Sequence, residues 1–272
     1  MFTPQGPTLR ELAVQALSSV ERGYDLLAPK FDHTPFRTPG RVLGATADAL
    51  RGLGPSDGRF EVGLDVCCGT GAGIGVLRSL CRERVVGVDF SAGMLAEAQG
   101  HHQVQDQTQQ EQHHAQQEHQ TQQVQVPTGE RPADPVVEYV RADARALPFA
   151  SAFDLAVTFG ALGHFLPAER AAVFAGVHRA LRPGGIFAFP LAAPPRPRSA
   201  LYWALLGFDA VMRVRNALWR PPFVMYYRTS SLRAVRADLA AAGFAVELVP
   251  VRGAGRRPDG APGWGLVVAR RR

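Results

Sequence analysis

Short apolar segments alternate with helical segments along most of the chain, and no other feature of the sequence restricts the fold as much. The apolar runs are four to seven residues long, too short for buried helices. Continuous apolar strands separated by helices are typical of a parallel sheet that is covered on both faces. We therefore predict a doubly wound α/β fold with a mostly parallel, seven-stranded sheet that ends in a C-terminal antiparallel hairpin. The expected strands are residues 60–66, 85–88, 136–140, 153–159 and 186–189, and the expected hairpin is residues 244–251 and 265–269.

The segments before and between the strands define the expected domain organisation. Thr8 and Glu11 form a capping-box pattern, and we expect the helix that it opens to reach Val20, with Gly23 as its stop. We assign residues 1–52 to a helical N-terminal cap and residues 53–272 to the main domain. Further helices are expected over residues 41–51, 73–83, 91–100, 167–181 and 231–242.

One segment of the main domain has almost nothing to bury. Residues 101–126 contain 12 glutamines and 5 histidines, which is a low-complexity composition. We predict a disordered Gln/His-rich insertion over residues 101–135. The pairs His101-His102 and His113-His114 leave metal binding open as a second interpretation.

A second long segment, residues 191–230, is rich in aromatic side chains. It exceeds a normal connection between a strand and the next helix. We predict a lid over a binding site for an apolar or aromatic molecule. Simple covering of the sheet and docking on a membrane surface are the alternatives. Its large side chains are Tyr202, Trp203, Phe208, Met212, Trp219, Phe223, Met225, Tyr226 and Tyr227.

Charge and cysteine content exclude several classes of protein. The formal net charge is +6, but the arginines are scattered and Lys30 is the only lysine, so we do not expect a nucleic-acid surface. The three cysteines have no CxxC spacing, which argues against a disulfide scaffold or a structural zinc site. No apolar stretch is long enough for a bilayer. We predict a cytoplasmic protein with no metal, and the oligomeric state stays open.

The ends of the first three strands carry the residues that indicate a ligand. The first strand leads into a turn with glycines at 69, 71 and 73, which lets the backbone approach a ligand at a helix N-terminus. The second strand ends in Asp89, where a carboxylate can accept hydrogen bonds from ribose hydroxyls. Asp143 follows the third strand and could accept from an adenine amino group. The glycine spacing does not match a dinucleotide fingerprint, because Ile74 stands where its third glycine would be.

These residues resemble the class I S-adenosylmethionine-dependent methyltransferases, of the type that acts on small molecules. Residues 65–73, DVCCGTGAG, are similar to the first motif of that family, and residues 85–95, VVGVDFSAGML, to its second strand and helix. Residues 143–149, 153–159 and 181–187 resemble its later motifs. The resemblance implies a Rossmann-like sheet and S-adenosyl-L-methionine as the cofactor. Cys67 departs from the pattern, because the family usually has its first glycine there.

The resemblance also implies a set of cofactor-binding residues. Gly69, Thr70 and Gly71 would line the methionine and ribose side, with Cys67 beside the methionine part. Asp65 would orient the loop or meet the amino group. Asp89 would hold the ribose, and Tyr24 of the cap would close over the cofactor. The adenine would lie among Phe90, Met94, Asp143 and Ala144, and the sulfonium near Phe159 and Gly160.

His164 is the best-placed candidate for a general base; a histidine that is only hydrogen-bonded to the loop backbone is the alternative. It comes five residues after Phe159, and a base is needed only for an acceptor that is protonated at neutral pH. We predict methyl transfer to a small, apolar or aromatic molecule, with the acceptor atom (O, N or C) left open. A non-catalytic cofactor-binding module remains a second interpretation. An NAD-linked oxidoreductase is a third, which the glycine spacing disfavours.

Overall fold

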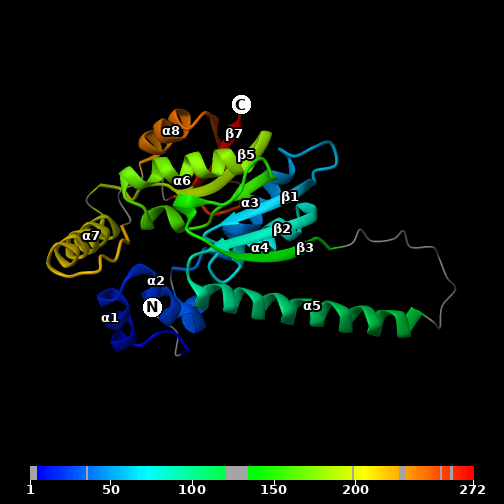
Figure 1. The fold of residues 1–272 in the computed structure, drawn as a ribbon, viewed down its shortest axis with the longest axis horizontal. Coiled ribbons are helices and arrows are strands. Elements are labelled where there is room, and N and C mark those ends of the chain that lie inside the picture. The colour runs from blue at the N-terminus through cyan, green and yellow to red at the C-terminus, as the bar shows by residue number, and fades with distance from the viewer. Residues whose placement is uncertain are drawn as a thin grey trace.

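Seven strands form one mixed sheet in the described part of this computed structural model, in the order β3-β2-β1-β4-β5-β7-β6 (Figure 1). Strands β1 to β5 run parallel to one another, and β7 is antiparallel to both β5 and β6. The predicted fold, with its closing hairpin, is therefore confirmed. The strands are β1 (Phe60–Val66), β2 (Cys81–Asp89), β3 (Val136–Arg141), β4 (Phe153–Val157), β5 (Leu181–Ala192), β6 (Phe244–Pro250) and β7 (Trp264–Arg271).

The structure describes residues 5–34, 36–120, 134–197, 199–226, 231–251, 253–257 and 260–272. Within these residues, no helix combines the length and the apolar character that crossing a bilayer requires. The α-helices are α1 (Leu9–Leu17), α2 (Val20–Leu27), α3 (Gly40–Arg51), α4 (Ala72–Arg78), α5 (Ala92–Gln120), α6 (Pro167–Ala180), α7 (Ala200–Leu218) and α8 (Leu232–Ala241), and the short 3-10 helices are η1 (Ala28–His33), η2 (Ala144–Ala146) and η3 (Ala161–His164).

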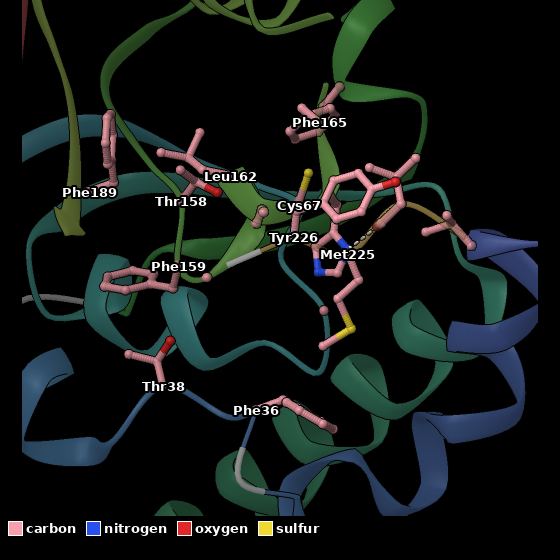
Figure 2. A pocket seen from close by; sticks show the side chains of 18 of the residues that line it. Phe36, Thr38, Cys67, Thr158, Phe159, Leu162, Phe165, Phe189, Met225 and Tyr226 are labelled. Atoms are coloured by element: carbon pink, nitrogen blue, oxygen red, sulfur yellow. Dashed lines mark hydrogen bonds between the residues drawn. The ribbon is translucent and has the colours of Figure 1, made fainter. Parts of the chain in front are cut away.

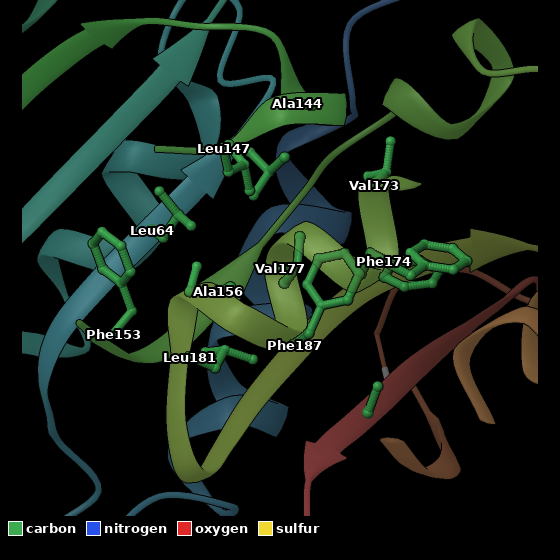
Figure 3. Packing of buried hydrophobic residues seen from close by; sticks show 14 of the residues in the cluster. Leu64, Ala144, Leu147, Phe153, Ala156, Val173, Phe174, Val177, Leu181 and Phe187 are labelled. Atoms are coloured by element: carbon green, nitrogen blue, oxygen red, sulfur yellow. The ribbon is translucent and has the colours of Figure 1, made fainter. Parts of the chain in front are cut away.

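Helices bury apolar side chains on both faces of the sheet. On one face, Val173, Phe174 and Val177 of α6 pack against strands β1, β4 and β5, as Figure 3 shows. Leu239 of α8 joins the same cluster. On the other face, α3, α4 and the start of α5 cover the sheet with a second cluster, to which Leu50 belongs. Burial on both faces explains why the strands read as continuous apolar runs.

The expected single N-terminal helix is in fact two helices. The hydroxyl of Ser18 donates to the carbonyl of Val14 at 2.7 Å, and the hydroxyl of Ser19 caps α2 by accepting from the N–H of Arg22 at 3.2 Å. These local bonds end one helix and start the next. Gly23, which we expected to be a stop, lies inside α2, where a Cβ atom would come within 2.7 Å of the Phe223 ring.

The expected boundary at Gly100 is also wrong, because α5 continues to Gln120. Glutamine is a good helix former, so a low-complexity composition does not by itself exclude a helix. The Arg78 guanidinium pairs with Asp106 at 2.8 Å and ties this part of the helix to the domain. Beyond that pair, α5 extends away from the sheet (Figure 1). Residues 121–133 of the expected insertion lie outside the described residues.

Candidate functional site

The carboxyl ends of β1, β2, β3 and β4 open onto one cavity of about 1800 Å³ (Figure 2). Carboxyl ends of strands are where open α/β sheets bind ligands. The N-terminal helices and the long connection after β5 supply the other walls. Of the candidate site residues, Gly71 is the exception that does not line the cavity; all the others do, namely Tyr24, Asp65, Cys67, Gly69, Thr70, Asp89, Phe90, Met94, Asp143, Ala144, Phe159, Gly160 and His164.

The glycine-rich turn is held by the carboxylate of Asp89. Asp89 Oδ2 accepts from the N–H of Gly69 at 3.0 Å, and Oδ1 accepts from the N–H of Ser91 at 2.9 Å. Gly69 and Gly71 have φ values of +53° and +92°, which favour glycine, and Gly71 precedes the first turn of α4. Burial raises the pKa of Asp89, and the backbone N–H bonds partly offset that shift. Asp89 therefore orders the turn in addition to facing the cavity.

Asp65, at the end of β1, is a buried acid with unmet hydrogen-bonding capacity. Its side chain is 1 % exposed, and neither carboxylate oxygen has a hydrogen-bond partner within the described residues. Burial, and then the nearby carboxylate of Asp89, raise the pKa of Asp65 well above its usual range. A Cβ atom at Gly73 would lie 2.3 Å from Asp65 Oδ2, so only glycine fits beside this carboxyl group. Unpaired buried acids are costly, so a donor from a ligand would be favourable here.

Cys67 adopts a backbone conformation that favours glycine. Its φ is +58°, in the left-handed region, which is uncommon for any residue other than glycine. Burial first, and then the charge of Asp89, raise the pKa of its thiol, so the group is neutral. Cys67, Cys68 and Cys81 are all free. Cys67 therefore occupies a left-handed position in the turn and places a thiol on the cavity wall.

The segment after β3 shows an ion pair that the sequence did not indicate. Arg145 donates to the Asp143 carboxylate at 2.7 Å from Nη2 and at 3.0 Å from Nε, and it also pairs with Glu169 at 2.5 Å. This guanidinium lowers the pKa of Asp143. Met94, which lines the same cavity, is 1 % exposed. Asp143, which we expected to accept from an adenine amino group, is therefore ionised and already bonded to Arg145.

His164, at the end of η3, is hydrogen-bonded at both ring nitrogens. Nδ1 lies 2.9 Å from the carbonyl oxygen of Val224, and Nε2 lies 2.8 Å from the hydroxyl of Tyr24. A carbonyl oxygen only accepts, so Nδ1 carries the proton, and the Tyr24 hydroxyl donates to Nε2. Burial lowers the pKa of His164, which keeps the ring neutral. The sequence singled out both residues but did not indicate that they form a pair.

Two acids of the N-terminal helices bind the strand ends directly. Asp25 of α2 accepts from the Ser91 hydroxyl at 2.6 Å and from the N–H of Gly93 at 2.9 Å, at the start of α5. Asp32 of η1 accepts from the Thr70 hydroxyl at 2.8 Å. Sequence reasoning missed both, because each bond joins residues far apart in the chain. Together they hold the N-terminal helices over the glycine-rich turn.

The connection after β5 contributes one side of α7 and the segment that follows it. Tyr202, Leu205 and Asn216 of α7 line the cavity, whereas Trp203 is 56 % exposed and does not. Met225 and Tyr226 lie on the opposite side of the cavity from Phe159 and Thr38, as Figure 2 shows. Tyr227 lies outside the described residues. Half of α7 therefore faces away from the site.

Comparison with known proteins supports one family. Residues 64–189 match the family model of a methyltransferase domain. An uncharacterised methyltransferase of Synechocystis, sll0829, is 38% identical over 87 residues, which are 32% of this chain and 40% of that protein. The chain therefore matches less than half the length of this relative.

Solved structures share the fold. An S-adenosylmethionine-dependent methyltransferase from Mesorhizobium loti aligns with a TM-score of 0.51 and 24% identity, over 84% of this chain and 98% of that one. The magnesium protoporphyrin IX methyltransferase of Synechocystis, solved with bound S-adenosylhomocysteine, aligns with a TM-score of 0.50 and 18% identity, over 85% and 84% of the two chains. The sheet order, the cavity at the strand ends and the family match agree. Residues 64–189 of this chain match a methyltransferase domain, on a fold that the chain shares with S-adenosylmethionine-dependent methyltransferases.

Proposed function

We propose that this protein transfers a methyl group from S-adenosylmethionine to a small acceptor of apolar or aromatic character. The cavity carries the proposal: its volume of about 1800 Å³ exceeds the roughly 300–1,000 Å³ typical of one small-molecule site. It runs from the acids at the strand ends to the aromatic residues after β5. Such a cavity has room for a cofactor and an acceptor together.

The chemistry of the strand ends supports the cofactor assignment. An ammonium donor, such as the amino group of the methionine portion, would give the buried carboxyl group of Asp65 a partner and favour its ionised form. Asp89 has acceptor capacity left for ribose hydroxyls, and Phe90 and Met94 offer apolar surface for an adenine. When bound, the cofactor supplies an electrophilic methyl group, so the protein mainly has to orient the acceptor and exclude water.

His164 is proposed as the general base, with Tyr24 as its hydrogen-bond partner. Nε2 is unprotonated and faces the Tyr24 hydroxyl, so an acceptor hydroxyl that takes the place of the phenol can give its proton to this nitrogen. The Val224 carbonyl fixes the tautomer that leaves Nε2 free to accept. This arrangement suits an acceptor whose attacking atom carries a proton, such as a phenol.

The proposal also covers the domain organisation of the chain and its cellular compartment. Residues 1–52 would act as a cap over the cofactor, which the bonds of Asp25 and Asp32 to the strand ends support. Residues 53–272 would form the catalytic unit, with residues 191–230 as the lid. The three free cysteines are consistent with a reducing compartment such as the cytoplasm.

A panel of acceptors tests the proposal. Phenols, aromatic amines and an adenine-containing oligonucleotide are incubated with S-adenosylmethionine, and S-adenosylhomocysteine is measured by mass spectrometry. We expect product with at least one phenol or amine. Product with the oligonucleotide alone, or with none of the probes despite cofactor binding, would contradict the acceptor class.

Two matched substitutions on α7 then locate the acceptor. Leu205 lines the cavity, whereas Leu218 is 81 % exposed. With the best probe, Leu205→Ala should lower kcat/KM about tenfold, because an apolar contact is worth roughly 1–3 kcal/mol. The affinity for S-adenosylhomocysteine should stay unchanged, and Leu218→Ala should match the wild type. Equal kcat/KM in all three proteins would place the acceptor elsewhere.

A further inference from the structure

The outer side of α7 is a continuous apolar stripe that faces solvent. At 100° per residue, one sector of the helix contains no polar side chain, and every residue in it is exposed. The large members are well exposed: Trp203 at 56 %, Val211 at 66 %, Val214 at 58 % and Leu218 at 81 %. The stripe consists of Ala200, Trp203, Ala204, Gly207, Ala210, Val211, Val214, Ala217 and Leu218. A contiguous exposed patch of this kind marks an interaction surface.

The charges around the stripe have one sign. Residues 190–226 contain five arginines and a single acid, Asp209, which is 4 % exposed. Arg213 lies beside the stripe on the helix, and Arg196 and Arg220 lie before and after the helix. All three are exposed. Arginines that surround an apolar helix surface bearing tryptophan are typical of helices that lie in the interface of an anionic bilayer.

The position of α7 leaves this surface accessible. Figure 1 shows α7 at the periphery of the molecule, on the side that carries α1 and α2. Arg215 donates to the carbonyl of Ser18 at 3.0 Å, and Met212 packs in a cluster with Phe223 and Tyr226. These contacts hold the inner side of the helix against the protein, so the stripe points outward.

We propose that α7 docks this protein on the surface of a membrane that contains anionic lipids. The apolar stripe would enter the headgroup region while Arg196, Arg213 and Arg220 contact lipid phosphates. The helix lies on the membrane and does not span it. This docking does not depend on the identity of the methyl acceptor.

Vesicle co-sedimentation of the full chain tests the proposal. The vesicles are phosphatidylcholine alone and phosphatidylcholine mixed with phosphatidylserine. We expect binding to the mixed vesicles that weakens as the salt concentration rises, and little binding to phosphatidylcholine alone. Failure to bind the mixed vesicles would overturn the proposal.

Matched double variants identify the surface. Val211→Ser with Val214→Ser should weaken binding at least about tenfold, because two exposed apolar side chains lose their burial in lipid. Val104→Ser with Val136→Ser changes two valines of similar exposure, both 62 %, outside α7 and should bind as the wild type does. Arg196→Gln with Arg213→Gln should weaken binding to the mixed vesicles alone, by roughly fivefold per arginine. An equal loss in the control pair would overturn the proposal.

Light scattering without vesicles separates lipid from a second copy of the chain. A dimer that Val211→Ser with Val214→Ser abolishes, together with an absence of vesicle binding, would assign the stripe to self-association and overturn the proposal. Circular dichroism and the binding of S-adenosylhomocysteine check that every variant is folded.

Discussion

Burial is the main cause of the pKa shifts of three ionisable side chains at the site, Asp65, Asp89 and His164. Asp65 and Asp89 lie close together at the ends of β1 and β2, and burial raises the pKa of both. Burial lowers the pKa of His164, because burial disfavours the charged form and the charged form of histidine is the protonated one. These three groups are therefore the ones whose chemistry depends most on what fills the cavity.

The variant Asp89→Ala tests whether this side chain binds the cofactor. Asp89→Ala removes charge-assisted hydrogen bonds worth about 1.5–3 kcal/mol each, so the affinity for S-adenosylhomocysteine should fall at least roughly tenfold, measured by calorimetry. The N–H groups of Gly69 and Ser91 also lose their acceptor, so the melting temperature of the ligand-free protein should fall by a few degrees, at roughly 2–4 °C per kcal/mol. The exposed Asp48→Ala serves as the control. An unchanged affinity in Asp89→Ala would remove Asp89 from the cofactor site.

The pH dependence tests His164. Burial lowers its pKa below the usual 6.5, so the ring stays neutral and able to accept a proton down to pH values below 6.5. We expect kcat/KM for a phenolic acceptor to fall only below pH 6.5. His164→Ala should lower the rate by roughly 10²–10⁴ and remove that acid limb. Tyr24→Phe should keep the limb, because the histidine remains.

The lowered pKa of His164 also predicts how the stability of the protein depends on pH. His164 binds a proton more readily in the unfolded chain than in the folded one, so the free energy of unfolding should decline as pH falls from about 6.5. His178, whose pKa burial also lowers, contributes in the same direction. A His164→Ala variant with the same pH profiles of rate and stability as the wild type would rule out the assignment.

At the scale of elements, α5 combines two different parts. Its first turns pack on the sheet, and Asp25 of α2 caps its start through Gly93. The Tyr139 hydroxyl donates to the carbonyl of Ala98 at 3.1 Å, and Arg78 binds Asp106. The structural part of α5 therefore reaches about as far as Asp106.

Two deletions separate these parts. Replacing residues 109–126 with a short Gly/Ser bridge should leave the melting temperature and cofactor affinity as they are. Replacing residues 101–126 also removes Asp106, one of the two acids, with Asp134, that pair with the nearly buried Arg78. It should lower the melting temperature by a few degrees, because a weakly exposed ion pair is worth roughly 1 kcal/mol and each kcal/mol shifts it by roughly 2–4 °C. Equal melting temperatures in a thermal scan would show that Asp106 has no structural role.

At the scale of the whole molecule, the site is assembled from parts that are distant in the chain. The N-terminal helices, the strand ends, η3 and α7 each contribute walls of one cavity. A ligand that contacts all of them should stabilise the whole fold, because it binds the folded protein and not the unfolded chain.

Thermal shift measures this coupling. S-adenosylhomocysteine at about 100 times its Kd contributes roughly 2.7 kcal/mol, which for a chain of this size corresponds to a rise of roughly 5–10 °C in melting temperature. NADH at the same concentration should give no shift. A shift with NADH and none with S-adenosylhomocysteine would favour the oxidoreductase interpretation.

The sequence by itself determined the sheet and the strand ends. Strands β1 and β3 begin where the apolar runs predicted, and the glycine-rich turn, Asp65 and Asp89 meet at one edge. These features depend on local patterns: apolar runs make strands, and parallel strands bring their carboxyl ends to the same edge. The length of α5 was mispredicted because composition describes what a segment can bury and not whether it forms a helix.

Only the tertiary structure decided which distant residues meet. Tyr24 and His164 are 140 positions apart, and Asp25 and Ser91 are 66 apart, so no local pattern relates them. The orientation of α7 was equally hidden, because apolar residues lie on both of its sides and periodicity cannot choose the buried one. Packing of Met212 and Phe208 in one cluster with Val20 and Tyr24 of α2 made that choice. It turned Leu205 into the cavity and left Trp203 in solvent.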